Sequence, residues 1–149
     1  MLEIGTGSGY QAAILSLLAK EVYTVEIVAQ LGTSAAETLK RLGYKNVFVR
    51  QGDGYNGWPQ KAPFDRIIVT AAAREAPPAL IDQIKIGGRM IIPLGETRDA
   101  QQLVQIDKTE EGLAGTPILP VRFVPLVHGR AGVSARQAKA PKGAKPERG

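Results

Sequence analysis

Three glycines at alternate positions near the start of the chain form the pattern that could carry chemistry. Gly5, Gly7 and Gly9 follow a short apolar run and leave a turn in which every second residue has no side chain. A ligand can lie against the backbone of such a turn, because no Cβ atom stands in its way. The turn therefore predicts a site for a nucleotide-type ligand.

The spacing of this turn argues against a dinucleotide. A dinucleotide-binding turn has the pattern G-x-G-x-x-G, whose third glycine lets helix and strand pack closely. Tyr10 stands at that third position, and Glu3 lies just before the turn. A carboxylate there would repel an anionic pyrophosphate, so a cationic or zwitterionic ligand fits better.

Two further carboxylates follow apolar runs later in the chain. Glu26 ends the run 22–25, where it is placed to accept hydrogen bonds from both hydroxyls of a ribose. Asp53 lies between two glycines after a third run. Each has a plainer interpretation: a strand-end carboxylate for Glu3, a solvated helix-entry residue for Glu26, and a Gly-Asp-Gly turn without a ligand for Asp53.

These residues, taken with later motifs, resemble the S-adenosylmethionine-dependent methyltransferases and, more narrowly, the protein-L-isoaspartate O-methyltransferase family. The glycine turn alone would indicate no more than a nucleotide-like ligand, whereas the combination is far more specific. The motifs that carry the resemblance span residues 2–128 in the order of the family: Leu2 to Gln11, Glu26, Gly52-Asp53-Gly54-Tyr55, Phe64-Asp65-Arg66-Ile67, Thr70-Ala71-Ala72-Ala73, Pro78-Ala79-Leu80, Gly87-Gly88-Arg89-Met90 and Val124-Pro125-Leu126.

The resemblance implies S-adenosyl-L-methionine as cofactor, with S-adenosyl-L-homocysteine as its product. It places Glu3 near the methionine moiety and Asp53 near the adenine amino group. The cofactor-binding residues that it implies are Glu3, Gly5, Thr6, Gly7, Ser8, Gly9, Glu26, Ile27, Asp53, Gly54 and Thr70. The substrate-binding residues that it implies are Ala71, Ala72, Val124, Pro125 and Leu126, although close helix packing or an apolar edge strand would explain them equally well.

The activity that the resemblance implies is methyl transfer to the α-carboxylate of L-isoaspartyl residues in damaged proteins, a repair reaction. A carboxylate is already ionised at neutral pH, so the displacement needs no general base and positioning supplies most of the catalysis. The chain has one histidine, His128, and no cysteine, which argues against a hydrolytic triad or a metal site. Isoaspartyl proteins and peptides are the expected partners of a monomer that binds neither nucleic acid nor membranes.

The strand before the glycine turn is unexpectedly short. It has three residues, Leu2-Glu3-Ile4, where about 5–6 are usual. Family members carry an upstream segment with a Ser or Thr credited with orienting the substrate, and no counterpart is visible here, so no catalytic residue is assigned. A fragment, a misplaced start codon or a lost segment would each explain this. Two alternatives therefore stay open: a truncated cofactor-binding module with little catalysis, and a methyltransferase for another acceptor.

Alternating apolar patterns predict the elements that must position these residues. One helix is expected over 10–20 with Tyr10, Ile14, Leu17 and Leu18 buried, and a second over 27–42. Strands are expected at 22–25, 46–50, 67–69 and 90–92, a short helix at 77–84, and a hairpin from 102–107 and 118–124, where Pro120 implies an edge or bulged strand. The fold class is therefore α/β: a Rossmann-like, doubly wound, mostly parallel sheet of the class I methyltransferases, with a C-terminal antiparallel hairpin.

The net charge of +5 is concentrated at the C-terminus. Residues 129–149 contain six Lys or Arg and one Glu, which accounts for all of the excess. We expect a methyltransferase domain over 1–128, truncated at its N-terminus, and a basic disordered tail over 129–149. The tail has no aromatic residue for base stacking, which argues against nucleic-acid binding. The absence of cysteine and of a long apolar run favours a cytoplasmic protein.

Overall fold

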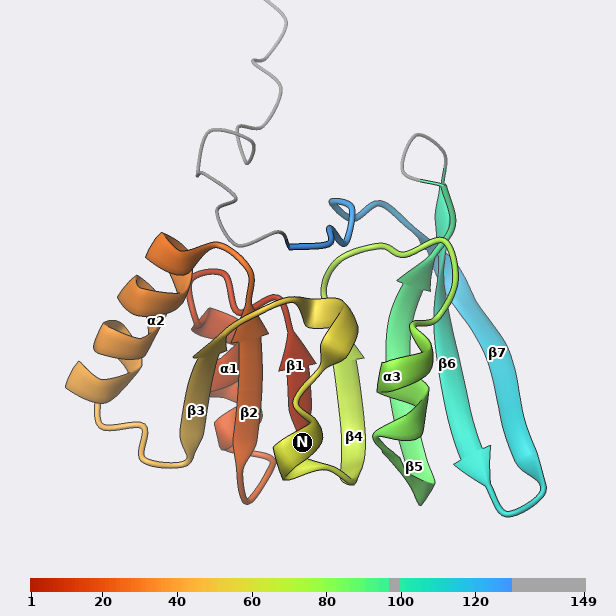
Figure 1. The fold of residues 1–149 in the computed structure, drawn as a ribbon, viewed down its shortest axis with the longest axis horizontal. Helices are drawn as coiled ribbons and strands as arrows, with labels where there is room; N and C mark the ends of the chain where they lie inside the picture. The colour runs from red at the N-terminus through yellow and green to blue at the C-terminus, as the bar shows by residue number, and fades with distance from the viewer. Residues whose placement is uncertain (97–99, 130–149) are drawn as a thin grey trace, which may run out of the picture.

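The structure, a computed structural model, describes residues 1–96 and 100–129. These residues form a seven-stranded sheet with the order β3-β2-β1-β4-β5-β6-β7 (Figure 1). The strands are β1 (Leu2–Ile4), β2 (Val22–Glu26), β3 (Val47–Gln51), β4 (Phe64–Val69), β5 (Ile84–Leu94), β6 (Gln101–Thr109) and β7 (Gly112–Val121).

The sheet is doubly wound, as predicted. From β1 the chain moves outward through β2 to β3 and then returns to the other side of β1 with β4 and β5, all in parallel. The strands β6 and β7 add an antiparallel hairpin beside β5. The direction of winding reverses between β1 and β4, and ligands of open α/β sheets bind at the carboxyl ends of the strands beside such a reversal.

Helices lie on both faces of this sheet. They are α1 (Tyr10–Ser16), α2 (Ala29–Arg41) and α3 (Pro78–Asp82), with short 3-10 turns at Gly54–Asn56 and Pro59–Lys61. Figure 1 shows α3 in front of the sheet and α1 behind it. Within the part of the chain that the structure describes, no helix is both long and apolar enough to cross a membrane.

The side chains of β1 and β2 alternate between two cores. Leu2, Ile4 and Val25 pack in one cluster with Leu80 of α3. Val22 packs in the other with Ala12 of α1 and Leu39 of α2. Thr24 is two residues from Val22 and therefore points to the same face of β2. Glu3 is paired with Thr24, so both polar side chains lie on the α1 side of the sheet.

The first predicted helix is shorter than expected and buries a different face. It ends at Ser16, and Ala12 and Ser16 are its buried residues. Tyr10, Ile14, Leu17 and Leu18, which we expected to be buried, are 74%, 43%, 78% and 81% exposed. Ala12 and Ser16 have the same four-residue spacing as the apolar stripe, and their small side chains allow a close approach to the sheet. The periodicity was therefore right, but the phase was wrong.

The predicted hairpin is present with a shifted second strand. The two strands meet at a tight turn, with Thr109 opposite Gly112, and β7 runs from there to Val121 rather than over 118–124. As expected from Pro120, β7 is an edge strand, and its pairing with β6 shifts register between Leu103 and Val104. An edge strand accommodates prolines because one side of it makes no ladder hydrogen bonds.

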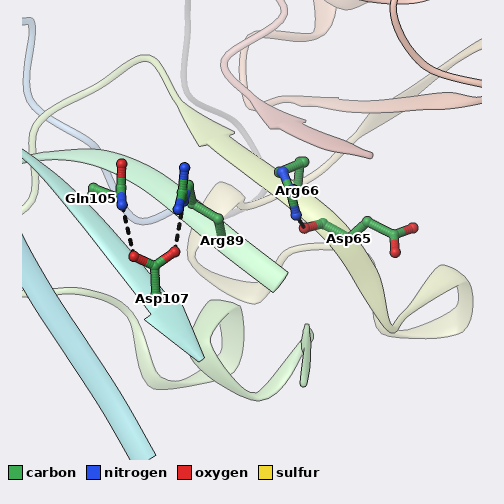
Figure 2. A network of polar contacts seen from close by, with 5 residues as sticks. All are labelled: Asp65, Arg66, Arg89, Gln105 and Asp107. Carbon is green, nitrogen blue, oxygen red and sulfur yellow. Dashed lines mark hydrogen bonds and ion pairs between the residues drawn. The ribbon is translucent and has the colours of Figure 1, made fainter. Parts of the chain in front are cut away.

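A polar network covers one face of β4, β5 and β6 (Figure 2). Arg89 Nε and Asp107 Oδ1 are 2.6 Å apart, and Gln105 Nε2 donates to Asp107 Oδ2 at 2.7 Å. The hydrogen bond from Arg89, followed by that from Gln105, holds the pKa of Asp107 below its usual value. Arg66 donates to the backbone carbonyl of Asp65 at 2.7 Å. These contacts lie on the sheet surface away from the carboxyl ends of β1 and β2.

Candidate active site

The carboxyl ends of four parallel strands bring the predicted residues to one edge of the sheet. Gly5 follows β1, Glu26 ends β2, Asp53 comes shortly after β3 and Thr70 follows β4. The segment after β7 crosses above these strand ends, as the blue ribbon in Figure 1 shows. The prediction that these residues lie together agrees with the structure; their role as ligands remains a prediction.

The glycine turn has a backbone that side chains would disturb. Gly5, Gly7 and Gly9 have φ values of 96°, 53° and 84°, in the left-handed region that favours glycine. A Cβ atom on Gly5 would overlap with the Thr70 hydroxyl, and one on Gly9 would lie 3.2 Å from Leu39 Cδ1. A Cβ atom on Gly7 would meet nothing within 4 Å. The turn is therefore packed at its two ends and open at its centre.

Glu26 ties this turn to the end of β2. Its Oε2 accepts a hydrogen bond from the N–H of Gly7 at 2.8 Å, and its Oε1 accepts one from the N–H of Val28 at 2.9 Å. Glu26 is 6% exposed, so the interpretation as a solvated helix-entry residue is wrong. Each carboxylate oxygen keeps a second lone pair, which can accept a hydroxyl of a ribose. Ile27 follows it and is half-buried.

Glu3 is a buried carboxylate with one unpaired oxygen. Its side chain is 0% exposed, and its Oε2 accepts a hydrogen bond from Thr24 Oγ1 at 2.6 Å. Among the described residues, no group hydrogen-bonds to its Oε1. Burial raises the pKa of Glu3 from 4.5 to about 7; the hydroxyl of Thr24 and the nearby amide of Gln11 oppose this, and the charge of Glu26 adds to it. Gln11 Nε2 is likewise buried and has no hydrogen-bond partner among the described residues. A buried, unpaired carboxylate oxygen fits a cationic ligand, so these residues suit the ammonium group of S-adenosylmethionine.

Asp53 holds the loop after β3. Its Oδ1 accepts from the N–H of Tyr55 at 2.9 Å and its Oδ2 from the N–H of Gly129 at 3.1 Å. His128 Nδ1 lies 3.4 Å from the same Oδ2, and the His128 ring stacks on Tyr55 with centroids 3.7 Å apart. Asp53 thus caps a turn, as the plainer interpretation required, and it also contacts the C-terminal segment.

Gly129, which contacts Asp53, lies where the resemblance places the adenine. A Cβ atom on Gly129 would lie 3.1 Å from Ile27 Cδ1 and 3.9 Å from Asp53 Cβ. Gly129 therefore lies near both Asp53, which the resemblance places near the adenine, and Ile27, another of the implied cofactor-binding residues. Gly54 is buried, and a Cβ atom there would overlap with the Ile4 side chain, so close packing explains this glycine.

The two predicted substrate-binding segments lie side by side. The N–H of Ala72 donates to the carbonyl of Val124 at 2.8 Å, and the N–H of Leu126 donates to the carbonyl of Ala72 at 2.7 Å. These bonds form an isolated parallel bridge between Ala72 and Pro125. Ala71 and Ala72 are buried, whereas Val124 is 70% exposed. Two small, buried residues therefore lie beside an exposed apolar segment.

Thr70 and Thr6 position the turn, and Ser8 lies on its surface. Thr70 Oγ1 lies 2.9 Å from the carbonyl of Ile4 and 3.0 Å from that of Gly5. Thr6 is buried, and its Oγ1 lies 2.6 Å from that of Thr24. Ser8 is exposed, with its Oγ 3.4 Å from the N–H of Tyr10.

Sequence reasoning missed three residues of this edge. Thr24 and Gln11 both affect Glu3, and His128, an exposed residue of the C-terminal segment, contacts Asp53. A signal for Thr24 was available, because a hydroxyl in a strand buried on both faces needs a hydrogen-bond partner. Nothing in the sequence indicated the contact of His128, which depends on the path of the chain after β7.

Comparisons with known proteins agree with this geometry. A curated relative from Syntrophobacter fumaroxidans, described as protein-L-isoaspartate O-methyltransferase 2, is 59% identical over 130 residues, which cover 87% of this chain and 53% of the relative. A solved protein-L-isoaspartate O-methyltransferase matches with a TM-score of 0.78 and 36% identity, over 83% of this chain and 40% of that one.

A second solved structure carries a ligand. This protein-L-isoaspartate O-methyltransferase from Plasmodium falciparum, in complex with S-adenosyl-L-homocysteine, matches with a TM-score of 0.74 and 27% identity, over 86% of this chain and 65% of that one. The fold is therefore that of the class I methyltransferases. The chain spans about half the length of the curated relatives it matches. Since the model of the family described as protein-L-isoaspartate(D-aspartate) O-methyltransferase matches residues 1–131, the chain belongs to that family.

Proposed function

We propose that this chain binds S-adenosyl-L-methionine at the glycine turn and takes part in methyl transfer to L-isoaspartyl residues of damaged proteins. The observation that carries the proposal is the buried Glu3 carboxylate with an unpaired oxygen, beside a glycine turn that is open at Gly7. Membership of the family supports the same cofactor.

Several of the predicted cofactor residues would each have a task at this edge. Glu3 would hold the ammonium group, and Glu26, which accepts the N–H of Gly7, would accept the ribose hydroxyls. Ile27 and Asp53 would hold the adenine, with Gly129 close to both residues. Gly7, around which there is open space, would leave room for the ligand, and Thr70 fixes the entry to the turn.

The residues beside the strand ends would receive the acceptor. Bound S-adenosylmethionine would supply an electrophilic methyl group on its sulfonium. The segment Val124-Pro125-Leu126, held against Ala72, would present the isoaspartyl peptide with its carboxylate toward that methyl group. No general base is needed, so these residues act by positioning the reactants and excluding water.

Two peptides that differ in one linkage test this proposal. The chain is incubated with methyl-labelled S-adenosylmethionine and a peptide that contains either an isoaspartyl or an aspartyl linkage. We expect label in the isoaspartyl peptide alone. Label in a non-peptide acceptor instead would support a methyltransferase of other specificity, and equal label in both peptides would contradict the proposed substrate.

A second candidate is a cofactor-binding module with little catalysis. The observation that favours it is that the residues brought to this edge are predicted cofactor residues, whereas no catalytic residue is assigned among them. Binding of S-adenosylhomocysteine without transfer to either peptide would support it. Co-expression with a relative's remaining segment would then test whether activity returns.

The location, oligomeric state, partners and domain bounds of the protein are also part of this proposal. We infer a cytoplasmic, monomeric protein that contacts isoaspartyl proteins and neither nucleic acid nor a membrane. We assign residues 1–128 to the methyltransferase domain. The basic stretch predicted as a disordered tail lies, from residue 130 on, outside the described residues.

A further inference from the structure

The hydroxyl of Thr24 lies between two other polar groups. Its Oγ1 is 2.6 Å from Glu3 Oε2 and 2.6 Å from Thr6 Oγ1. Thr24 donates its hydrogen to Glu3, and this direction is the one that the ionised carboxylate requires, because it can only accept hydrogen bonds. Thr6 must then give its own hydrogen to Thr24. Two hydroxyl groups are thus aligned in one direction, toward the carboxylate.

This chain of hydrogen bonds joins three elements. Glu3 and Thr24 are direct neighbours in the pairing of β1 with β2, and Thr6 belongs to the glycine turn. All three side chains are buried. The bonds fix one oxygen of Glu3 and leave Oε1 without a partner among the described residues.

We propose that Thr24, supported by Thr6, is a positioning residue that holds the Glu3 carboxylate oriented for the ammonium group of the methyl donor. This inference rests on the proposed function. It adds a specific role for a residue of β2 that neither the glycine turn nor the acidic positions indicate. Thr24 itself acts through Glu3 and needs no contact with the cofactor.

The surroundings of Glu3 explain why hydroxyl groups matter here. Glu26, at the end of β2, carries a negative charge that disfavours a second one on Glu3. The other neighbours are neutral: α1 contributes Gln11, and β4 contributes Ile68, which is paired with Glu3. Among the described residues, no basic side chain contributes to its pKa. Donated hydrogen bonds are therefore what favours the ionised carboxylate against the cost of burial.

The first test needs no cofactor. We would follow the side-chain carboxyl carbon of Glu3 by carbon-13 NMR across a pH titration in the wild type, Thr24→Val and Thr24→Ser. Thr24→Val removes the hydroxyl at nearly constant volume and should raise the midpoint by about one to two pH units, since a hydrogen bond to a charged group is lost. Thr24→Ser keeps the hydroxyl and should titrate like the wild type. The matched control is Thr116→Val on the exposed edge strand β7.

The second test measures S-adenosylhomocysteine binding by calorimetry between pH 5.5 and 8.5. At pH 7, Thr24→Val should bind about tenfold more weakly than the wild type, and the difference should narrow toward pH 8.5 as Glu3 ionises. Thr24→Ser should bind like the wild type.

The outcomes distinguish the role of Thr24 from the proposed binding of the cofactor. An unchanged NMR midpoint in Thr24→Val would overturn the inference. A shifted midpoint with a loss of affinity that is equal at every pH would overturn the link to the cofactor. If the wild type fails to bind at any pH, the proposed function fails, while the titration still decides whether Thr24 orients Glu3.

Discussion

Replacement of Glu3 by Gln should stabilise the folded chain at alkaline pH. The folded protein holds the Glu3 proton up to about pH 7, whereas the unfolded chain releases it near the ordinary pKa of 4.5. Between these values the folded state binds the additional proton, so the contribution of this group to stability is full below pH 4.5 and is lost as the pH rises through 7. At about 1.4 kcal/mol for each pKa unit, the loss amounts to about 3 kcal/mol.

The amide of Glu3→Gln has no proton to release, but its oxygen can still accept the hydrogen bond from Thr24. The free energy of unfolding in urea should therefore fall for the wild type relative to Glu3→Gln by about 3 kcal/mol between pH 4.5 and pH 8. Other titrating groups occur in both proteins and cancel in this difference. Glu37→Gln, at an exposed position of α2, is the matched control and should show no such trend.

A constant difference between wild type and Glu3→Gln over this pH range would refute the reasoning. It would mean that Glu3 ionises in the folded protein as it does in the unfolded chain, and hence that water or a cation reaches it without a ligand. The same variant should bind S-adenosylhomocysteine more weakly at pH 8, where the wild type carries the charge. Greater stability with weaker binding is the pattern expected of a residue kept for its ligand.

Three other substitutions probe the edge of the sheet and the core. Glu26→Ala should weaken S-adenosylhomocysteine binding by about 1–3 kcal/mol in calorimetry, because it removes the ribose acceptor and frees the N–H of Gly7; unchanged affinity would remove Glu26 from the site. Gly5→Ala should abolish binding through its overlap with the Thr70 hydroxyl, whereas Gly43→Ala, with a φ of 84° and open space around it, should cost about 1 kcal/mol in thermal unfolding and leave binding intact. Leu80→Ala should cost about 2–5 kcal/mol in urea unfolding, because Leu80 is fully buried, against about 0.5 kcal/mol for Leu113→Ala on exposed β7; similar costs would contradict the assigned core.

The sequence was sufficient for the fold because its strongest signals are local. Continuous apolar runs such as 67–69 mark strands buried on two faces, and glycines mark the turns between elements. The phase of α1 was wrong for a physical reason: Ala12 and Ser16 pack against the sheet because they are small, and hydrophobic periodicity gives small residues little weight. Strand bounds in the hairpin were wrong because β7 is exposed, so burial imposes no pattern on it.

The candidate site could be predicted at positions where the backbone conformation allows only one residue type. Gly5 and Gly9 are such cases, since their conformations and close neighbours exclude a side chain. Contacts between distant segments could not be predicted in the same way. The bonds between Asp53 and Gly129, or between Glu3 and Thr24, depend on sheet order and strand register, which sequence patterns determine weakly.

The acidic residues of this edge differ in how many hydrogen bonds their carboxylates accept from the protein itself. Glu26 accepts two backbone N–H groups and Asp53 accepts two more, so a substitution at either position changes the loops as well as any ligand contact. Glu3 accepts one hydroxyl and has an oxygen without a partner among the described residues. A neutral amide at Glu3 removes charge with little loss of structural bonding. Among these carboxylates, Glu3 is therefore the position at which a substitution that weakens cofactor binding is expected not to weaken the fold.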